Sequence, residues 1–100
     1  MINVREAQGA FSVLDTTGTV QTATMRLRRG EESGPFGNDH SRSAQVLFVV
    51  SGAVRAEIGE KIFRMETGDS VVVEKGLAHR FVGDSDEDAV TFNVYAPPAY

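Results

Sequence analysis

Short segments with alternating apolar and polar side chains occupy most of this chain, and clusters of Gly, Asp, Asn and Ser separate them about every ten residues. This alternation predicts half-buried strands, because successive side chains of a strand point to opposite faces. In residues 89–95 the valines and Phe92 share one face, and Thr91, Asn93 and Tyr95 share the other. The pattern predicts strands at residues 11–15, 19–28, 45–50, 53–58, 61–65, 70–73, 79–82 and 89–95, with loops at 30–39 and 83–88.

Residue usage supports strands over helices. The chain has thirteen Val but only four Leu, and β-branched side chains favour the pleated sheet. No segment shows the spacing of an amphipathic helix. The turn at Gly59-Glu60 has the two-residue length of a hairpin. We therefore predict an all-β fold, an antiparallel barrel or a double-sheet sandwich, in one domain over residues 1–100.

Composition and charge exclude several classes of function. The net charge of −4 provides no basic face for nucleic acid. The chain has no Cys, which excludes disulfides, thiolate metal sites and a Cys nucleophile. The longest apolar run, residues 46–50, is far shorter than the ~20 residues of a membrane span. Residues 1–6 lack the apolar core of a signal peptide, so we expect a cytoplasmic protein without a membrane partner.

The run at residues 46–50 predicts a homodimer. Its side chains, Val-Leu-Phe-Val-Val, are apolar on both faces of the expected strand. A strand that faced water on one side would alternate, so something covers the outer set. A second sheet of the same chain is one possible cover, and a second copy of the chain is the one that we favour.

The two histidines lie in motifs of defined spacing. The first motif runs from Gly34 through His40 to Gly52, and the second runs from Gly68 through His79 to Gly83. These segments resemble the two cupin motifs, G-x5-H-x-H-x3-4-E-x6-G and G-x5-P-x-G-x2-H-x3-N. About fifteen residues separate them, as in a small cupin, and the resemblance extends from residue 30 to the end. Residues 94–98 and the short His-to-Gln spacing resemble the subset called mannose-6-phosphate-isomerase-like.

The resemblance implies a cupin-type antiparallel jelly-roll barrel, also called a double-stranded β-helix. In metal-binding cupins, three His and one Glu hold a divalent ion inside that barrel. Here His40 and His79 match two of the histidines, Arg42 replaces the third, and Gln45 replaces the Glu. The resemblance therefore implies a site at His40, Gln45 and His79 for Mn, Fe, Ni or Zn. Because these donors carry no negative charge, the site could also hold no metal.

Arg42 offers a different cation for the same pocket. His40 and Arg42 are two residues apart, so on a regular strand both would point inward. An inward guanidinium would repel a divalent ion by about 6–7 kcal/mol at ~5 Å and would bind a carboxylate, sulfate or phosphate instead. Alternatively, it pairs with a surface carboxylate. We expect Met25 and Phe92 to line the ligand pocket, although core packing would also explain both.

Two functions stay open at this point. The first is a divalent-metal-dependent isomerase, lyase or dioxygenase acting on a small hydroxy-carbonyl or carboxylate compound. The second is a metal-free binding or sensing module in which Arg42 holds an anionic ligand. A structural role without turnover is a third reading, since the cupin fold supports many functions. The sequence does not decide whether the chain is an enzyme.

Overall fold

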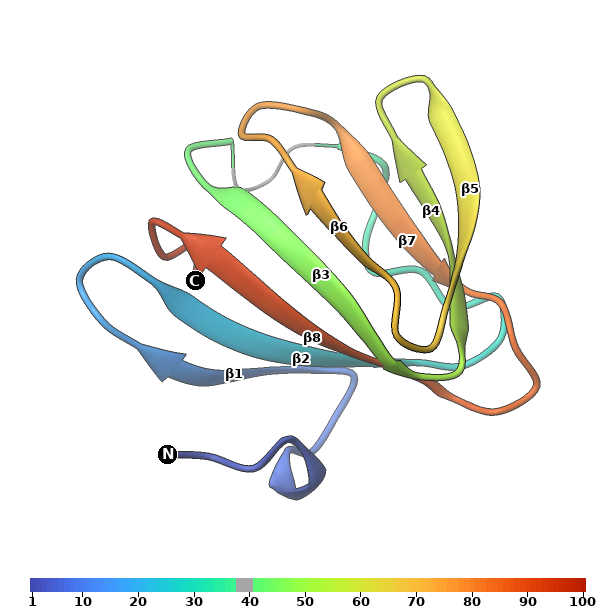
Figure 1. Ribbon diagram of the computed structural model, residues 1–100, viewed down its shortest axis with the longest axis horizontal. Coiled ribbons are helices and arrows are strands. Elements are labelled where there is room, and N and C mark those ends of the chain that lie inside the picture. The colour runs from blue at the N-terminus through green and yellow to red at the C-terminus, as the bar shows by residue number, and fades with distance from the viewer. Residues whose placement is uncertain (38–40) are drawn as a thin grey trace.

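A computed structural model describes residues 1–37 and 41–100, and the regular secondary structure of this part of the chain is almost entirely antiparallel strand (Figure 1). A one-turn 3-10 helix at Val4–Glu6 precedes the first strand. Among the described residues, no helix has the length and apolar character needed to cross a membrane. The strands are β1 (Phe11–Thr16), β2 (Gln21–Leu27), β3 (Ala44–Ser51), β4 (Ala53–Ile58), β5 (Lys61–Glu66), β6 (Ser70–Val73), β7 (His79–Gly83) and β8 (Ala89–Ala96).

Two sheets form the two walls of a barrel (Figure 1). The larger has the strand order β1-β2-β8-β3-β6 and the smaller has the order β5-β4-β7. The strand prediction is confirmed within one or two residues at every boundary. The start of β2 differs most, because the Thr17 hydroxyl accepts a hydrogen bond from the Val20 amide and extends the turn to that residue. The predicted antiparallel jelly-roll barrel is confirmed.

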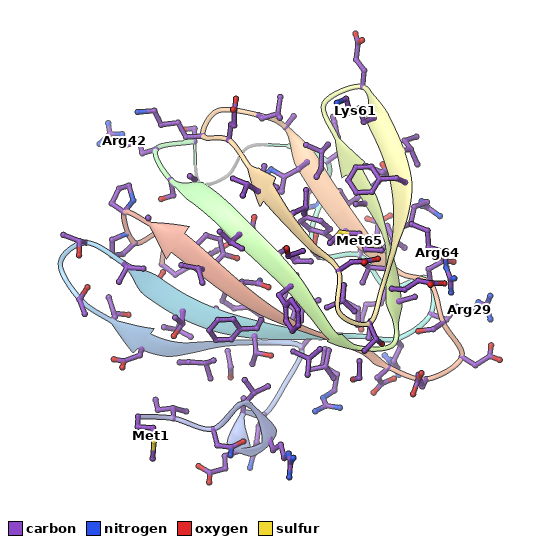
Figure 2. All side chains as sticks on the ribbon, viewed as in Figure 1. Met1, Arg29, Arg42, Lys61, Arg64 and Met65 are labelled. Atoms are coloured by element: carbon purple, nitrogen blue, oxygen red, sulfur yellow. The ribbon has the colours of Figure 1, made fainter. Side chains whose placement is uncertain are left out.

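The core lies between the two sheets. Most of it consists of alternate side chains from β2, β3 and β4, as the period of two predicts, and β5, β6, β7 and β8 each contribute one side chain. Met65 of β5 also lies in this core, between the two sheets (Figure 2). Burial of this apolar set is the main stabilising contribution, at roughly 25 cal/mol per Å² removed from water. The buried apolar cluster comprises Met25, Leu27, Leu47, Val49, Val54, Ala56, Ile58, Met65, Val73, Phe81 and Ala89.

An irregular segment covers the edge of the smaller sheet beside β7. The Gly30 amide donates to the Gly83 carbonyl, and the Gly83 amide donates to the Glu31 carbonyl, both at 2.9 Å. Further along, the Ser33 amide donates to the carbonyl of Phe81, and its hydroxyl accepts from the Phe81 amide. Residues 28–37 thus satisfy the backbone of the β7 edge, which would otherwise be open to pairing.

The outer faces of the two sheets differ in chemistry. The smaller sheet carries a chain of ion pairs, in which Glu57 contacts Arg80 at 2.7 Å and Arg55 at 3.1 Å. The larger sheet instead presents apolar side chains on β3 and β6. Phe48 is 37 % exposed and Val72 is 62 % exposed. Water solvates the first face readily, whereas the second face is the kind that proteins usually cover.

The ion pairs of Glu57 make stability depend on pH. The hydrogen bond from Arg80 is the largest cause that lowers the pKa of the Glu57 carboxyl below its ordinary 4.5. A lowered folded-state pKa stabilises the fold above the unfolded-state value, and this contribution is lost as pH falls through the folded-state value. We expect the urea midpoint of the wild type to exceed that of Glu57→Gln at pH 7, with the difference shrinking below pH 4.5. An equal difference at pH 7 and pH 2.5 would contradict this.

Candidate functional site

A small cavity opens between the two sheets, beside the segment that covers β7. Its volume is about 50 Å³, which is more than the roughly 10–15 Å³ that a cavity needs to hold one water molecule. Its walls combine buried polar groups with aromatic rings, and none of the described lining residues is an Asp, Glu, Lys or Arg. The described lining residues are Phe11, Met25, Ser33, Gly34, Pro35, Gly37, Gln45, His79, Phe81, Tyr95 and Tyr100.

Gln45 brings an unsatisfied acceptor to this cavity. It is the second residue of β3, and its side chain is 2 % exposed on the inner face. Its amide nitrogen donates weakly to the Tyr95 hydroxyl at 3.4 Å. Its Oε1 atom is buried and has no hydrogen-bond partner among the described residues. A buried polar atom without a partner costs about 1–3 kcal/mol, so this oxygen favours binding of a donor or a cation.

A row of polar side chains along β8 orients that amide. The Thr91 hydroxyl donates to Asn93 Oδ1 at 2.8 Å, and Asn93 Nδ2 donates to the Tyr95 hydroxyl oxygen at 3.2 Å. The Tyr95 oxygen therefore accepts from both amides, which directs the Gln45 nitrogen toward Tyr95 and its Oε1 away from it. Burial is the largest cause that raises the pKa of Tyr95 well above its ordinary 10. The phenol consequently stays protonated and neutral at physiological pH.

The backbone sets the tautomer of the His79 ring. Its Nδ1 lies 2.8 Å from the Leu77 carbonyl oxygen. Because a carbonyl can only accept, Nδ1 carries the proton in the neutral ring, and the lone pair is on Nε2. Two backbone hydrogen bonds to Gly37 fix the residue, at 2.9 Å from the His79 amide and 3.3 Å to its carbonyl. The ring also packs at 6.0 Å from that of Phe81. Such fixation is typical of a histidine that binds a metal or a ligand.

The structure brings three of the predicted site residues to the cavity. Gln45, His79 and Met25 all line it. His40, the third predicted metal ligand, lies outside the described residues. No group of three or more His, Asp or Glu that could hold a metal is present in the described ranges.

Phe92 does not line the cavity. It pairs with Thr24 and Phe48 on the outer face of the larger sheet, and the alternate residues of β8 point inward. The expectation placed Phe92 inside the barrel. The structure reverses this assignment, because the inner row of β8 forms the polar network beside the cavity, and the apolar row forms the outer face.

Arg42 lies in the turn before β3, and its side chain is exposed and directed away from the barrel (Figure 2). The parity argument required a regular strand at residues 40–42, whereas β3 begins at Ala44. The structure therefore does not bring the guanidinium into the cavity. A cation bound at Gln45 and His79 would not face this charge directly.

Sequence reasoning missed the aromatic part of the site. Phe11, Tyr95 and Tyr100 line the cavity, and none was predicted to do so. Tyr95 could have been found from its place in the polar set of residues 89–95, in register with Gln45. Tyr100 and Phe11 are 89 positions apart and carry no motif, so only the folded chain shows that they meet.

These observations define a class of protein: a barrel of two antiparallel sheets with imidazole and amide donors at an internal cavity. The Cupin domain (Cupin_2) matches residues 23–95. The chain belongs to this cupin family, as its two motifs predict. Its narrower resemblance to the mannose-6-phosphate-isomerase-like subset is not confirmed.

Known proteins are similar along most of the chain. A germin-like protein of Arabidopsis thaliana, subfamily 3 member 4, is 38% identical over 90 residues. That match covers 85% of this chain but only 41% of the plant protein. The protein BH2720 from Bacillus halodurans has a TM-score of 0.88 at 18% identity, with 97% of this chain and 76% of the other covered. KdgF from Halomonas sp. has a TM-score of 0.79 at 23% identity, with 88% and 77% covered. These two likenesses establish the fold.

Proposed function

We propose that this cupin binds a small molecule at the cavity with the help of a divalent first-row metal held by His40, Gln45 and His79. The observation that carries the proposal is the buried, unsatisfied Gln45 Oε1 in a cavity that His79 also lines. An amide oxygen and a fixed imidazole are both acceptable ligands for Mn, Fe, Ni or Zn. Because these ligands are few, they leave coordination positions on the ion for a ligand or water.

The proposed substrate class matches the polar groups that line the cavity. The hydroxyl of a hydroxy-carbonyl compound can donate a hydrogen bond to Gln45 Oε1, whose second lone pair remains for a bound ion. A carboxylate can complete the charge of that ion. The Tyr95 phenol stays protonated and helps to hold the Gln45 amide in place. When bound, the metal supplies a Lewis acid that polarises a carbonyl or carboxylate oxygen. This chemistry suits an isomerase, a lyase or a dioxygenase.

Nothing in the fold or in the comparisons favours the metal-free alternative. It assigned anion binding to Arg42 within the pocket, and Arg42 is exposed in the turn before β3. The absence of a nucleic-acid or membrane partner and the cytoplasmic location stay predictions.

Removing the proposed ligands tests the metal site. We expect isothermal titration with Mn²⁺ to show that Gln45→Leu and His79→Ala each weaken binding at least about tenfold, because each removes one donor. The matched control is Thr24→Val, which removes a buried hydroxyl outside the cavity and should bind Mn²⁺ like the wild type. Thermal melts confirm that each variant folds. Unchanged affinity in both ligand variants would contradict the proposal.

We further propose that a second copy covers the apolar outer face of the larger sheet. Phe48, Val46 and Val50 of β3 are all exposed by more than a third, and Val72 of β6 lies beside them. An identical patch on a second copy is complementary to it across a two-fold axis. The outer face of the smaller sheet carries the ion pairs of Glu57, with Ile62 exposed beside them.

A charge at the centre of this patch should separate the copies. We expect sedimentation equilibrium to give twice the 10.8 kDa chain mass for the wild type. Phe48→Asp should give a monomer, because a carboxylate is costly to bury without a partner. The control Ile62→Asp changes an exposed residue of β5 and should remain dimeric. A wild-type monomer, or the same mass for both variants, would refute this interface.

A further inference from the structure

The segment after β8 returns over the cavity and is held by a buried side chain. Gln21 of β2 is 1 % exposed. Its Oε1 accepts from the amides of Ala99 and Tyr100 at 3.1 and 2.9 Å, and its Nε2 donates to the Tyr100 carbonyl at 2.8 Å. The Ser43 hydroxyl also donates to the Pro97 carbonyl at 2.6 Å. These hydrogen bonds fix the backbone of Tyr100 as a strand partner would.

The ring of Tyr100 is fixed as well, although much of it faces solvent. Its centroid lies 4.8 Å from that of Phe11 and 5.2 Å from that of Tyr95, in tilted and edge-on geometries. Tyr100 is 60 % exposed and Phe11 is 37 % exposed, yet both line the cavity. An exposed aromatic ring held in one position is an available packing surface, and such rings contribute strongly to recognition.

The size of the cavity explains why a ligand would reach these rings. About 50 Å³ holds one polar group of a ligand, such as a hydroxy-carbonyl. The remainder of the molecule must extend past the solvent edge of the cavity, where Phe11 and Tyr100 lie. The polar interior and the aromatic edge therefore match a molecule with one polar end and one apolar face.

We propose that Phe11 and Tyr100 form an aromatic subsite that packs against the ring of a ligand whose hydroxy-carbonyl end enters the cavity. Gln21 is a positioning residue that holds Tyr100 at this edge. The inference rests on the proposed function, because it requires the polar end of the ligand to bind beside Gln45 and His79. It adds a preference for ring compounds over acyclic ones.

Two small compounds distinguish binding at the aromatic subsite from binding in the cavity. 2-Hydroxyacetophenone carries a ring and a hydroxy-carbonyl group, whereas hydroxyacetone carries only the latter. We expect NMR titrations of the wild type to show tighter binding of the ring compound. Tyr100→Ala should weaken its binding roughly three- to tenfold, the range of an aromatic contact, and should leave hydroxyacetone unchanged. Tyr100→Phe should keep the preference.

Further variants test the positioning role and the specificity of the effect. Gln21→Leu removes the hydrogen bonds that hold Tyr100. It should lower the affinity for 2-hydroxyacetophenone relative to that for hydroxyacetone, a ratio that a general loss of stability would not change. Phe63→Ala removes a similarly exposed ring on β5, outside the cavity, and should change neither affinity. Thermal melts confirm folding throughout.

The outcomes distinguish a failure of the aromatic subsite from a failure of the proposed ligand site in the cavity. If hydroxyacetone binds and Tyr100→Ala leaves both affinities unchanged, the aromatic subsite is wrong and the cavity proposal stands. If Tyr100→Phe loses as much affinity as Tyr100→Ala, the hydroxyl and not the ring is responsible, and the subsite is again wrong. If neither compound shifts any resonance of the wild type, both proposals are wrong.

Discussion

Replacing Gly83 with alanine is expected to lower the free energy of unfolding by about 3 kcal/mol, the upper range for overpacking. A Cβ at this position would lie 2.1 Å from the Arg28 carbonyl oxygen and 2.8 Å from the Arg28 carbonyl carbon. These are backbone atoms, so no side-chain rotation relieves the clash. At about 4–8 °C per kcal/mol for a chain of this size, the melting temperature should fall by roughly 10–25 °C.

The clash also affects the site, because residues 28–37 pair with β7 through Gly83. Displacing Arg28 would move the segment that carries Ser33 and Gly37 at the wall of the cavity. Gly18→Ala is the matched control. No atom lies within 4 Å of a Cβ built there, and its φ is outside the left-handed region. It should change stability by less than about 0.5 kcal/mol. Equal urea midpoints for the two variants would show that the segment does not approach β7 so closely.

Replacing Gln45 with glutamate is expected to tighten Mn²⁺ binding by about ten- to a hundredfold. The substitution keeps the shape of the side chain and places a negative charge where Oε1 now lies buried without a partner. A carboxylate and a divalent ion ~4 Å apart attract each other by about 8 kcal/mol at an effective dielectric constant of ~20. Desolvation of the carboxylate offsets much of this gain, which leaves the smaller net effect. Isothermal titration measures the change.

The same variant should be less stable than the wild type when metal-free. A buried carboxylate without a partner costs free energy and raises its own pKa. Adding Mn²⁺ should therefore raise the melting temperature more in Gln45→Glu than in the wild type, by linkage of binding to folding. Gln45→Leu, which has no donor, should show the smallest increase of the three proteins. Unchanged or weaker Mn²⁺ binding by Gln45→Glu would place the ion elsewhere.

Much of this fold follows from local signals in the sequence. The turns at Gly59 and Gly68 and the period of two place every strand within two residues. Pairing between strands is non-local, and the motif resemblance implied the type of barrel but not the strand order. Phe92 of β8 was wrongly assigned to the interior because hydrophobicity predicts the interior only where the interior is apolar. Beside the cavity it is polar, and Thr91, Asn93 and Tyr95 satisfy one another there.

The candidate site was predictable where a motif position coincides with a regular element. Gln45 on β3 and His79 on β7 fulfil this condition, and both line the cavity. Arg42 does not, since a turn at residues 41 and 42 breaks the alternation that would have directed it inward. Tyr100 depends on hydrogen bonds to Gln21, which lies 79 positions away. No local pattern carries that information.

The metal content of the protein, purified without added metal or chelator, tests the central claim most directly. Elemental analysis gives the ratio of each first-row metal to the chain. The account predicts a ratio near one for Mn, Fe, Ni or Zn, and a ratio near zero for His79→Ala prepared in the same way. A wild-type ratio near zero that added Mn, Fe, Ni or Zn cannot raise would contradict it.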